Sequence, residues 1–236
     1  MTQKKFNLTQ SILDTLGKEI VAGKYANDRF PVESELCARF DASRSVLREA
    51  VKMLTSKGLL HSRQRKGTDI SPEEHWSLLD PDILRWLLES KPSLALLQEF
   101  MEIRLSIEPQ AAAYAAERAN KDQIAKILHA LERMKAAEER QDDPLEPDIQ
   151  FHTAILEASN NRFFIQLEEL VRTALTISIH VTNELKGVRT ANVADHKKVL
   201  DFILIRDADA AYAEMKILLS GALKLIKEAH KDTLLI

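Results

Sequence analysis

The chain has 236 residues, of which 45% are apolar and 29% charged, a composition typical of globular rather than disordered proteins and sufficient for two domains. Its single cysteine excludes an internal disulfide framework, and we interpret Cys37 as a small buried hydrophobic residue. No signal-peptide-like apolar stretch follows the first lysines, and nowhere do about 18 apolar residues run together. The sequence therefore predicts a soluble, cytoplasmic protein without a membrane partner.

Positive charge is concentrated in the first 70 residues. This part carries 13 Lys and Arg against 8 Asp and Glu, a net charge of +5, whereas the whole chain has a net charge of −3. The remaining residues therefore carry −8. Because cationic surfaces attract phosphate, this asymmetry favours nucleic-acid binding by the N-terminal part only.

Three helices are predicted before residue 58. Residues 11–21 place their large apolar side chains on one helical face, and Pro31 opens a second short helix that runs to Phe40. The third helix has Ser43 as its N-cap and ends at Gly58, a residue that tolerates a left-handed turn. Its apolar stripe consists of Leu47, Ala50, Val51 and Leu54.

A cationic face lies opposite this stripe. In a major groove, the first turn of such a helix would present Arg44 and Ser45 to base edges, with Arg48 one turn further along. Arg44 is the leading candidate for base reading because an arginine fork can pair with O6 and N7 of guanine. The alternative is an ordinary solvated helix face. The candidate DNA-binding residues of this helix are Ser43, Arg44, Ser45 and Arg48.

A short basic hairpin is predicted between Leu59 and Thr68. Its cations suit the phosphates or the minor groove, where they add salt-dependent affinity but little sequence discrimination. Three helices followed by a hairpin is the order of a winged helix-turn-helix, so these features together predict a DNA-binding protein. The candidate hairpin contacts are Arg63, Arg65, Lys66 and Gly67.

The sequence predicts a mainly α protein with an N-terminal winged helix-turn-helix DNA-binding domain over residues 1–70 and a linker over 71–80. An all-α helical bundle over 81–236 is expected to bind an effector and to dimerise. Asp80 and Pro81 read as the N-cap and first residue of the bundle. We interpret Trp76 and Trp86 as packing between the domains. The further helices are predicted near 93–119, 121–141, 147–159, 162–186, 192–206 and 208–230.

Two spacings in the helical part indicate a binding site. Asp148 and His152 are four residues apart and share a helix face, so with a third group, for which His196 is suited, they could hold a divalent metal. A surface hydrogen bond between the two is the alternative. Arg104 lies four residues before Glu108, which is equally compatible with a water-exposed salt bridge.

The chain resembles the GntR family of bacterial transcription regulators. The likeness rests on the segments 31–36, 43–50 and 63–68, although Arg65 and Asp69 depart from the usual hairpin pattern. The helical remainder is similar to the effector-binding domain of the FadR subfamily, and residues 76–86 resemble regulators of sugar-acid catabolism. The resemblance implies a dimer that binds a palindromic operator in double-stranded DNA and responds to a small carboxylate effector.

The resemblance also implies roles for the helical-domain candidates. Members of the family place an Asp and several His residues around a metal. The resemblance therefore implies that Asp148, His152 and His196 bind a divalent metal such as Zn, Ni or Mn. Leu218 stands where the family's last histidine is usual, so the ligand set is incomplete. The family also carries an arginine at the position of Arg104, implying a clamp for the effector carboxylate.

The sequence does not decide whether several further polar residues bind an effector or have a structural role. Asn192 could contact an effector hydroxyl or cap its own helix, and the further cavity candidates are Asn161, His180 and Thr182. Without a metal, the same Asp and His side chains would bond effector hydroxyls directly.

Function is expected to be that of a ligand-responsive repressor and not of an enzyme, because no nucleophile elbow, Gly-rich phosphate loop or zinc-hydrolase motif occurs. The alternatives are a structural dimeric DNA-binding protein without an effector, and a metal-dependent hydrolase built on the Asp and His side chains.

Overall fold

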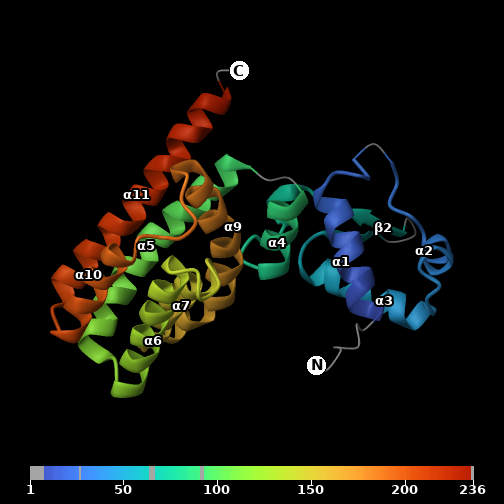
Figure 1. Cartoon of the computed structure of the whole chain (residues 1–236). Helices are drawn as coiled ribbons and strands as arrows, with labels where there is room; N and C mark the ends of the chain where they lie inside the picture. Colours follow the sequence, from blue (N-terminus) through green and yellow to red (C-terminus); the bar gives the residue numbers. More distant parts are fainter. Residues whose placement is uncertain (1–7, 27, 64–66, 91–92, 235–236) are drawn as a thin grey trace. The chain divides into compact units, whose positions relative to one another are not determined.

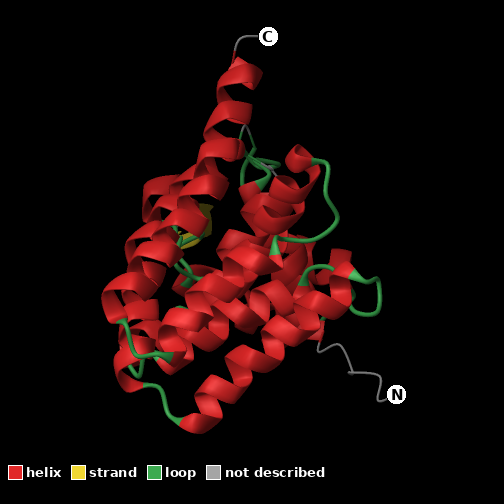
Figure 2. Cartoon of the chain, turned by 60° about the vertical axis from the view of Figure 1, so that its left-hand side comes forward, coloured by secondary structure: helices red, strands yellow, loops and turns green. Residues whose placement is uncertain are grey.

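The chain folds as two compact units, residues 1–92 and 93–236 (Figure 1). This computed structural model describes residues 8–26, 28–63, 67–90 and 93–234. Helices dominate both units, and the strands of the described residues form one hairpin (Figure 2). The structure confirms the predicted fold class of a winged helix-turn-helix followed by a helical domain.

The first unit follows the predicted order of three helices and a hairpin. The antiparallel hairpin pairs Leu60 with Ile70 and Arg63 with Gly67. Arg65 and Lys66, two of the predicted hairpin contacts, lie outside the described residues. The elements are α1 (Leu8–Val21), α2 (Glu33–Phe40), α3 (Arg44–Ser56), β1 (Leu60–Arg63), β2 (Gly67–Ile70), the 3₁₀ helix η1 (Glu73–His75) and α4 (Pro81–Ser90).

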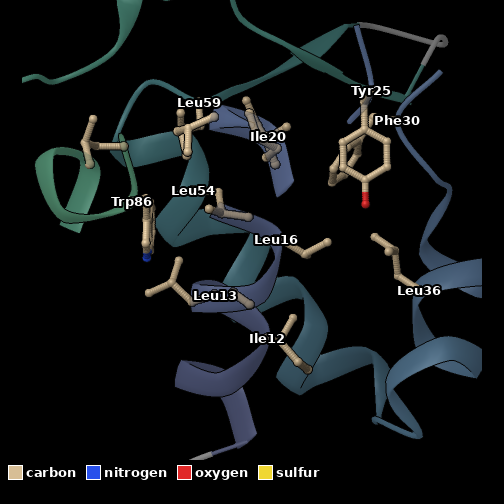
Figure 3. Packing of buried hydrophobic residues seen from close by; sticks show 14 of the residues in the cluster. Ile12, Leu13, Leu16, Ile20, Tyr25, Phe30, Leu36, Leu54, Leu59 and Trp86 are labelled. Carbon is tan, nitrogen blue, oxygen red and sulfur yellow. The ribbon is translucent and has the colours of Figure 1, made fainter. Parts of the chain in front are cut away.

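The apolar faces of α1 and α3 meet in one core, because each helix carries its large apolar residues at helical spacing (Figure 3). Ser43 caps α3 as predicted, its hydroxyl accepting from the Val46 amide. Gly58 has φ +82°, and a Cβ there would stand 2.1 Å from the carbonyl oxygen of His75. Glycine is thus required both by the backbone conformation and by the close approach of a second chain segment.

The boundary between the units lies after residue 92, not at residue 80 as the sequence suggests. Residues 71–80 are part of the first unit rather than a linker, since the Ser77 amide donates to the Lys57 carbonyl at 3.0 Å. Trp76 and Trp86 belong to the core of that unit, which corrects their interpretation as packing between domains. A polar, proline-bearing segment reveals a turn but not the surface onto which that turn folds back.

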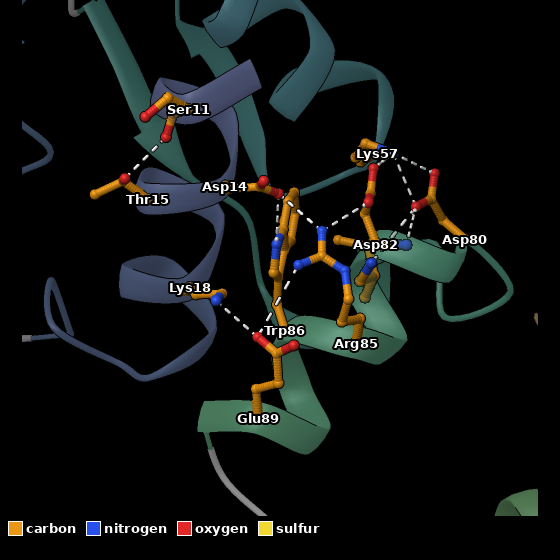
Figure 4. A network of polar contacts seen from close by, with 11 residues as sticks. Ser11, Asp14, Thr15, Lys18, Lys57, Asp80, Asp82, Arg85, Trp86 and Glu89 are labelled. Carbon is orange, nitrogen blue, oxygen red and sulfur yellow. Dashed lines mark hydrogen bonds and ion pairs between the residues drawn. The ribbon is translucent and has the colours of Figure 1, made fainter. Parts of the chain in front are cut away.

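Polar contacts hold α4 against the rest of the first unit (Figure 4). Asp14 accepts hydrogen bonds from Arg85 Nη2 at 2.8 Å and from Trp86 Nε1 at 3.2 Å. Lys57, just after α3, donates to both carboxylate oxygens of Asp80, which also accepts from the backbone of the first turn of α4. These contacts make α4 an integral element of the first unit.

The second unit is all-helical. Its long last helix lies along its first, as Figure 1 shows, and the remaining helices complete the bundle. The predicted helix over 162–186 is divided at Leu167. No described helix is long and apolar enough to cross a membrane. The elements are α5 (Leu94–Arg118), α6 (Lys121–Glu138), α7 (Glu146–Ala158), α8 (Arg162–Gln166), α9 (Glu168–Lys186), α10 (Val193–Leu204) and α11 (Ala208–Leu234).

Candidate functional site

The candidate DNA surface lies on the first turns of α3. The side chains of Arg44 and Arg48 are 77% and 68% exposed, and Ser45 is exposed beside them. The Ser43 and Ser45 hydroxyls are 2.9 Å apart. The structure therefore gathers the four helix residues predicted from the sequence on one accessible surface.

Glu33, at the start of α2, was not singled out by the sequence pattern. Its carboxylate accepts from Arg48 Nε at 2.8 Å and lies 3.7 Å from Arg44 Nε. The hydrogen bond from Arg48 lowers the pKa of Glu33. This acid thus pairs with Arg48 and lies beside Arg44, two of the candidate DNA-binding residues.

The second candidate site is a cavity of about 480 Å³ in the helical unit. That volume is typical of sites for small organic ligands. The walls are contributed by α5, α7, α9, α10 and α11. The predicted residues that line the cavity are Arg104, Asp148, His152, Thr182, Asn192, His196 and Leu218.

Asp148, His152 and His196 come together in this cavity, and each is at most 4% exposed. Asp148 Oδ1 is 3.3 Å from Nε2 of His152 and 3.2 Å from Nε2 of His196. Potential ligand atoms of the three side chains all lie within 4.8 Å of one another. Their burial contradicts the alternative of a surface hydrogen bond.

The hydrogen bonds of the two histidines fix which ring nitrogen faces Asp148. His152 Nδ1 donates to Glu108 Oε2 at 2.6 Å, and His196 Nδ1 donates to the Asn192 carbonyl at 2.8 Å. Both Nε2 atoms therefore face Asp148 Oδ1, at 3.3 Å for His152 and 3.2 Å for His196. They could act as metal ligands if an ion replaced the proton shared with the carboxylate, with the Nδ1 contacts as the outer hydrogen bonds common around metal-bound histidine.

These distances fit a shared divalent ion. Ligand atoms that each lie about 2.0–2.2 Å from one metal stand roughly 3–3.5 Å apart, close to the Asp148 distances. One carboxylate and two imidazoles are ligands that Zn, Ni and Mn accept. Three protein ligands leave positions for water or an effector, and Leu218, on the wall of the same cavity, supplies no donor atom.

Arg104 and Glu108 form a buried ion pair, not the water-exposed one that the spacing also allows. Arg104 Nε and Nη2 donate to the two Glu108 oxygens at 2.5 and 3.2 Å, and the side chains are 4% and 1% exposed. Arg104 Nη1 faces the Met101 sulfur at 3.4 Å. Because a thioether is a weak acceptor, Nη1 retains capacity for a stronger partner.

Arg104, Glu108, Asp148, His152 and His196 form one buried group of contacting side chains, the charged cluster. Its cationic groups stabilise the ionised form of its carboxylates. Burial raises the pKa of Glu108, but Arg104 and His152 outweigh it and bring that pKa to about 2. Burial likewise raises the pKa of Asp148, yet His196 and His152 lower it well below its usual range. For His152 burial lowers the pKa, and Glu108 more than reverses the effect. Both carboxylates are therefore anionic at neutral pH.

Other sequence candidates have structural roles or lie elsewhere. Asn192 is the N-cap of α10, its side chain accepting from the Ala194 amide. Asn161 caps α8, and His180 is exposed. Glu108 is the functional residue that the sequence interpretation undervalued. The sequence contained a signal for the burial of Glu108. The apolar and alanine residues of α5 surround the helix instead of forming one stripe, a pattern typical of a helix buried on all sides.

A winged helix-turn-helix with an accessible cationic helix, followed by a helical unit with a cavity that contains buried polar side chains, defines a DNA-binding transcription regulator. The chain belongs to the GntR family of bacterial regulatory proteins, which its residues 8–70 match, and its residues 99–221 match the FCD domain. This combination is the FadR-type arrangement. Because the family consists of transcription regulators, the chain is a regulator and not an enzyme.

Two relatives illustrate the similarity. The galactonate operon transcriptional repressor of Escherichia coli K12 is 33% identical over 226 residues, which cover 94% of this chain and 98% of the relative. The Uxu operon transcriptional regulator of the same organism is 28% identical over 80% of this chain and 74% of its own length.

Solved structures share the fold. The Lar protein of Listeria monocytogenes matches with a TM-score of 0.61 at 16% identity, covering 96% of this chain and 99% of that structure. The McbR/YncC protein of E. coli matches with a TM-score of 0.52 at 18% identity, over 95% of this chain and 99% of its own.

Proposed function

We propose that this regulator is a repressor that binds a palindromic operator as a homodimer and releases it when a small carboxylic acid enters the cavity of its helical unit. The observation that carries this proposal is the cavity that joins the buried side chains of Arg104, Asp148, His152 and His196. A relative named as a galactonate operon repressor supports a sugar acid or hydroxy acid as the ligand.

DNA reading is assigned to the exposed surface of α3. Arg44 contacts a base edge, an interaction that contributes about 1–3 kcal/mol of discrimination when bidentate, and Ser43, Ser45 and Arg48 contact the adjacent groove. Arg63, Arg65, Lys66 and Gly67 of the hairpin bind phosphate or the minor groove. Two copies of the chain place two such helices on half-sites about one duplex turn apart. The operator lies in the bacterial cytoplasm, where the protein acts.

Acid binding is assigned to the cavity. The Arg104 donors that face Met101 bind the ligand carboxylate, because a buried carboxylate is costly unless a cation pairs with it. Asp148, His152 and His196 would hold a divalent ion, Zn, Ni or Mn, which would attract carboxylate and hydroxyl oxygens of the acid. Asn192 contributes its carbonyl, which orients His196.

Regulation requires that the acid bind more tightly to one conformation of the chain than to another. The acid stabilises the helical unit because it binds only the folded state. Of the chain's two conformations, the one that binds the acid more tightly has the lower affinity for the operator.

A thermal-shift screen of the full chain tests the proposal. Aldonates, uronates, short hydroxy acids and fatty acids are each added with and without divalent metals, and operator binding is measured in parallel. We expect at least one acid to raise the melting temperature and weaken operator binding. If DNA binding is tight and indifferent to every acid, the chain is a structural DNA-binding protein without an effector.

Two substitutions separate the two assigned sites. Arg44→Ala should weaken operator recognition and leave the acid-induced thermal shift intact.

Arg104→Ala should retain operator binding and lose the response to the acid. An Arg104→Ala variant that releases DNA at wild-type acid concentrations would contradict the carboxylate assignment.

A further inference from the structure

Ser178, in the middle of α9, has a buried hydroxyl without a hydrogen-bond partner among the described residues, and the residue is 2% exposed. A helical serine or threonine ordinarily satisfies its hydroxyl on the carbonyl four residues earlier. The described helices of this chain contain six hydroxyls that do so: Thr15, Thr55, Ser106, Thr153, Thr176 and Thr182. Ser178 does not form this hydrogen bond to its own helix.

Ser178 lies in the wall of the cavity to which the acid is assigned. Thr182, one helical turn later on the same face of α9, also lines that cavity. Arg104, Asp148 and His152 come from α5 and α7, so α9 forms a separate part of the wall. Ser178 Oγ bonds to none of them, so the charged cluster leaves this hydroxyl unsatisfied.

We propose that Ser178 binds a ligand hydroxyl additional to those that the charged cluster engages, so that the acid is a polyhydroxylated chain of the aldonate type. This inference rests on the proposed function and narrows its ligand class. A short 2-hydroxy acid carries its carboxylate and hydroxyl on neighbouring carbons, both of which the charged cluster can engage. A further hydroxyl is needed to satisfy Ser178 as well, and rotation about χ1 of Ser178 can direct Oγ toward it.

An unpartnered hydroxyl also gives the cavity selectivity. A buried donor without a partner destabilises the complex with any acid that lacks the matching group, whereas a polyol satisfies it. Sites built to bond a ligand hydroxyl reject analogues without that hydroxyl more strongly than sites that rely on shape alone. The same serine that binds an aldonate therefore disfavours lactate-like acids and fatty acids.

The test compares Ser178→Ala with the wild-type full chain by titration calorimetry, using a panel of six-carbon aldonates and L-lactate with the divalent metal that best supports binding. Ser178→Ala should weaken binding of the preferred aldonate about tenfold, the loss of about one hydrogen bond. Its affinity for L-lactate should stay unchanged or rise, because lactate offers the hydroxyl no partner. The matched control is Thr176→Ala, which removes an exposed hydroxyl on the same helix that already bonds to the Arg172 carbonyl.

Stability of the unliganded chain provides a second readout. A structural hydroxyl would lower the melting temperature when removed, whereas removal of an unpartnered one should leave it unchanged or raise it. Equal losses for aldonate and lactate, no loss for either, or a lower melting temperature of unliganded Ser178→Ala would overturn the inference. A wild-type chain that binds only short acids or fatty acids would overturn it and leave the proposed function standing. A wild-type chain that binds no acid would reject both.

Discussion

Glu33 places one carboxylate between the two arginines that are proposed to read DNA. Side chains as long as arginine lose rotamer entropy when they are fixed against a base, and an acid that already restrains them reduces this loss. The same negative charge repels the phosphate backbone. Glu33 should therefore lower DNA affinity in general and favour the correctly oriented arginines at the operator.

Substitution of Glu33→Gln tests this balance. We expect higher affinity for random DNA, because a negative charge is removed, and a three- to tenfold lower ratio of operator to random affinity, because Arg44 and Arg48 lose their restraint. Competition binding at two salt concentrations measures both quantities. Glu49→Gln, an equal charge change on an exposed position of α3, is the control. A ratio that falls equally in both variants would assign the effect to charge alone.

Leu218 offers a gain-of-function test of the metal assignment. The residue lines the cavity that contains Asp148, His152 and His196, at the position where the family's last histidine is usual. Leu218→His should raise affinity for Zn or Ni about tenfold or more by adding a nitrogen ligand, as competition with a chelator would measure. Leu218→Met, similar in size, is the control. Unchanged metal affinity in Leu218→His would contradict the proposed metal position.

At the level of the elements, the packing of α4 on α1 depends on the absence of one side chain. A Cβ at Gly17 would lie 2.5 Å from ring atoms of Trp86, which is fully buried. The glycine weakens α1 as an isolated helix, but it lets the indole reach Asp14. Helix propensity is thus subordinate here to the joining of two elements.

Gly17→Ala should destabilise the first unit by about 1–3 kcal/mol, the usual cost of overpacking, despite the gain in helix propensity. Tryptophan fluorescence during urea unfolding reports this unit specifically, because both tryptophans of the chain lie in it. Gly221→Ala is the matched control, since a Cβ there meets nothing within 4 Å and should stabilise its helix by up to about 1 kcal/mol. Stabilisation by Gly17→Ala would show that Trp86 does not occupy this site.

At the scale of the whole molecule, the two units divide the proposed functions between them. The DNA surface lies entirely within residues 1–92 and the cavity entirely within residues 93–236. A fragment that ends at residue 92 keeps α4 and its contacts, whereas one that ends at residue 80 loses Trp86 from the core.

We expect fragment 1–92 to unfold cooperatively and to bind operator DNA without any response to acids. Fragment 1–80 should be several kcal/mol less stable, comparable to the loss of a large aromatic residue from a core. Urea unfolding followed by circular dichroism and operator binding at equal concentration would compare them. Equal stability of the two fragments would place the boundary of the DNA-binding unit at residue 80 instead.

The sequence by itself determined the elements of this protein. Helical spacing, the caps Ser43 and Asn192 and the left-handed glycine Gly58 are local signals, so the winged helix-turn-helix and most helices of the bundle could be predicted. The exposed arginines of α3 followed from the same periodicity. Asp148 and His152 were recognisable as a pair because four residues separate neighbours on one helix face.

Only the tertiary structure decided which distant segments meet. Trp86 joins the first unit because Gly17 leaves room for it, and Glu108 is buried against His152 although 44 residues separate them. Ser178 became a candidate only when its hydroxyl was found without a partner. Local spacing fixes the face of a helix on which a side chain lies, whereas burial and partners depend on what packs against that face.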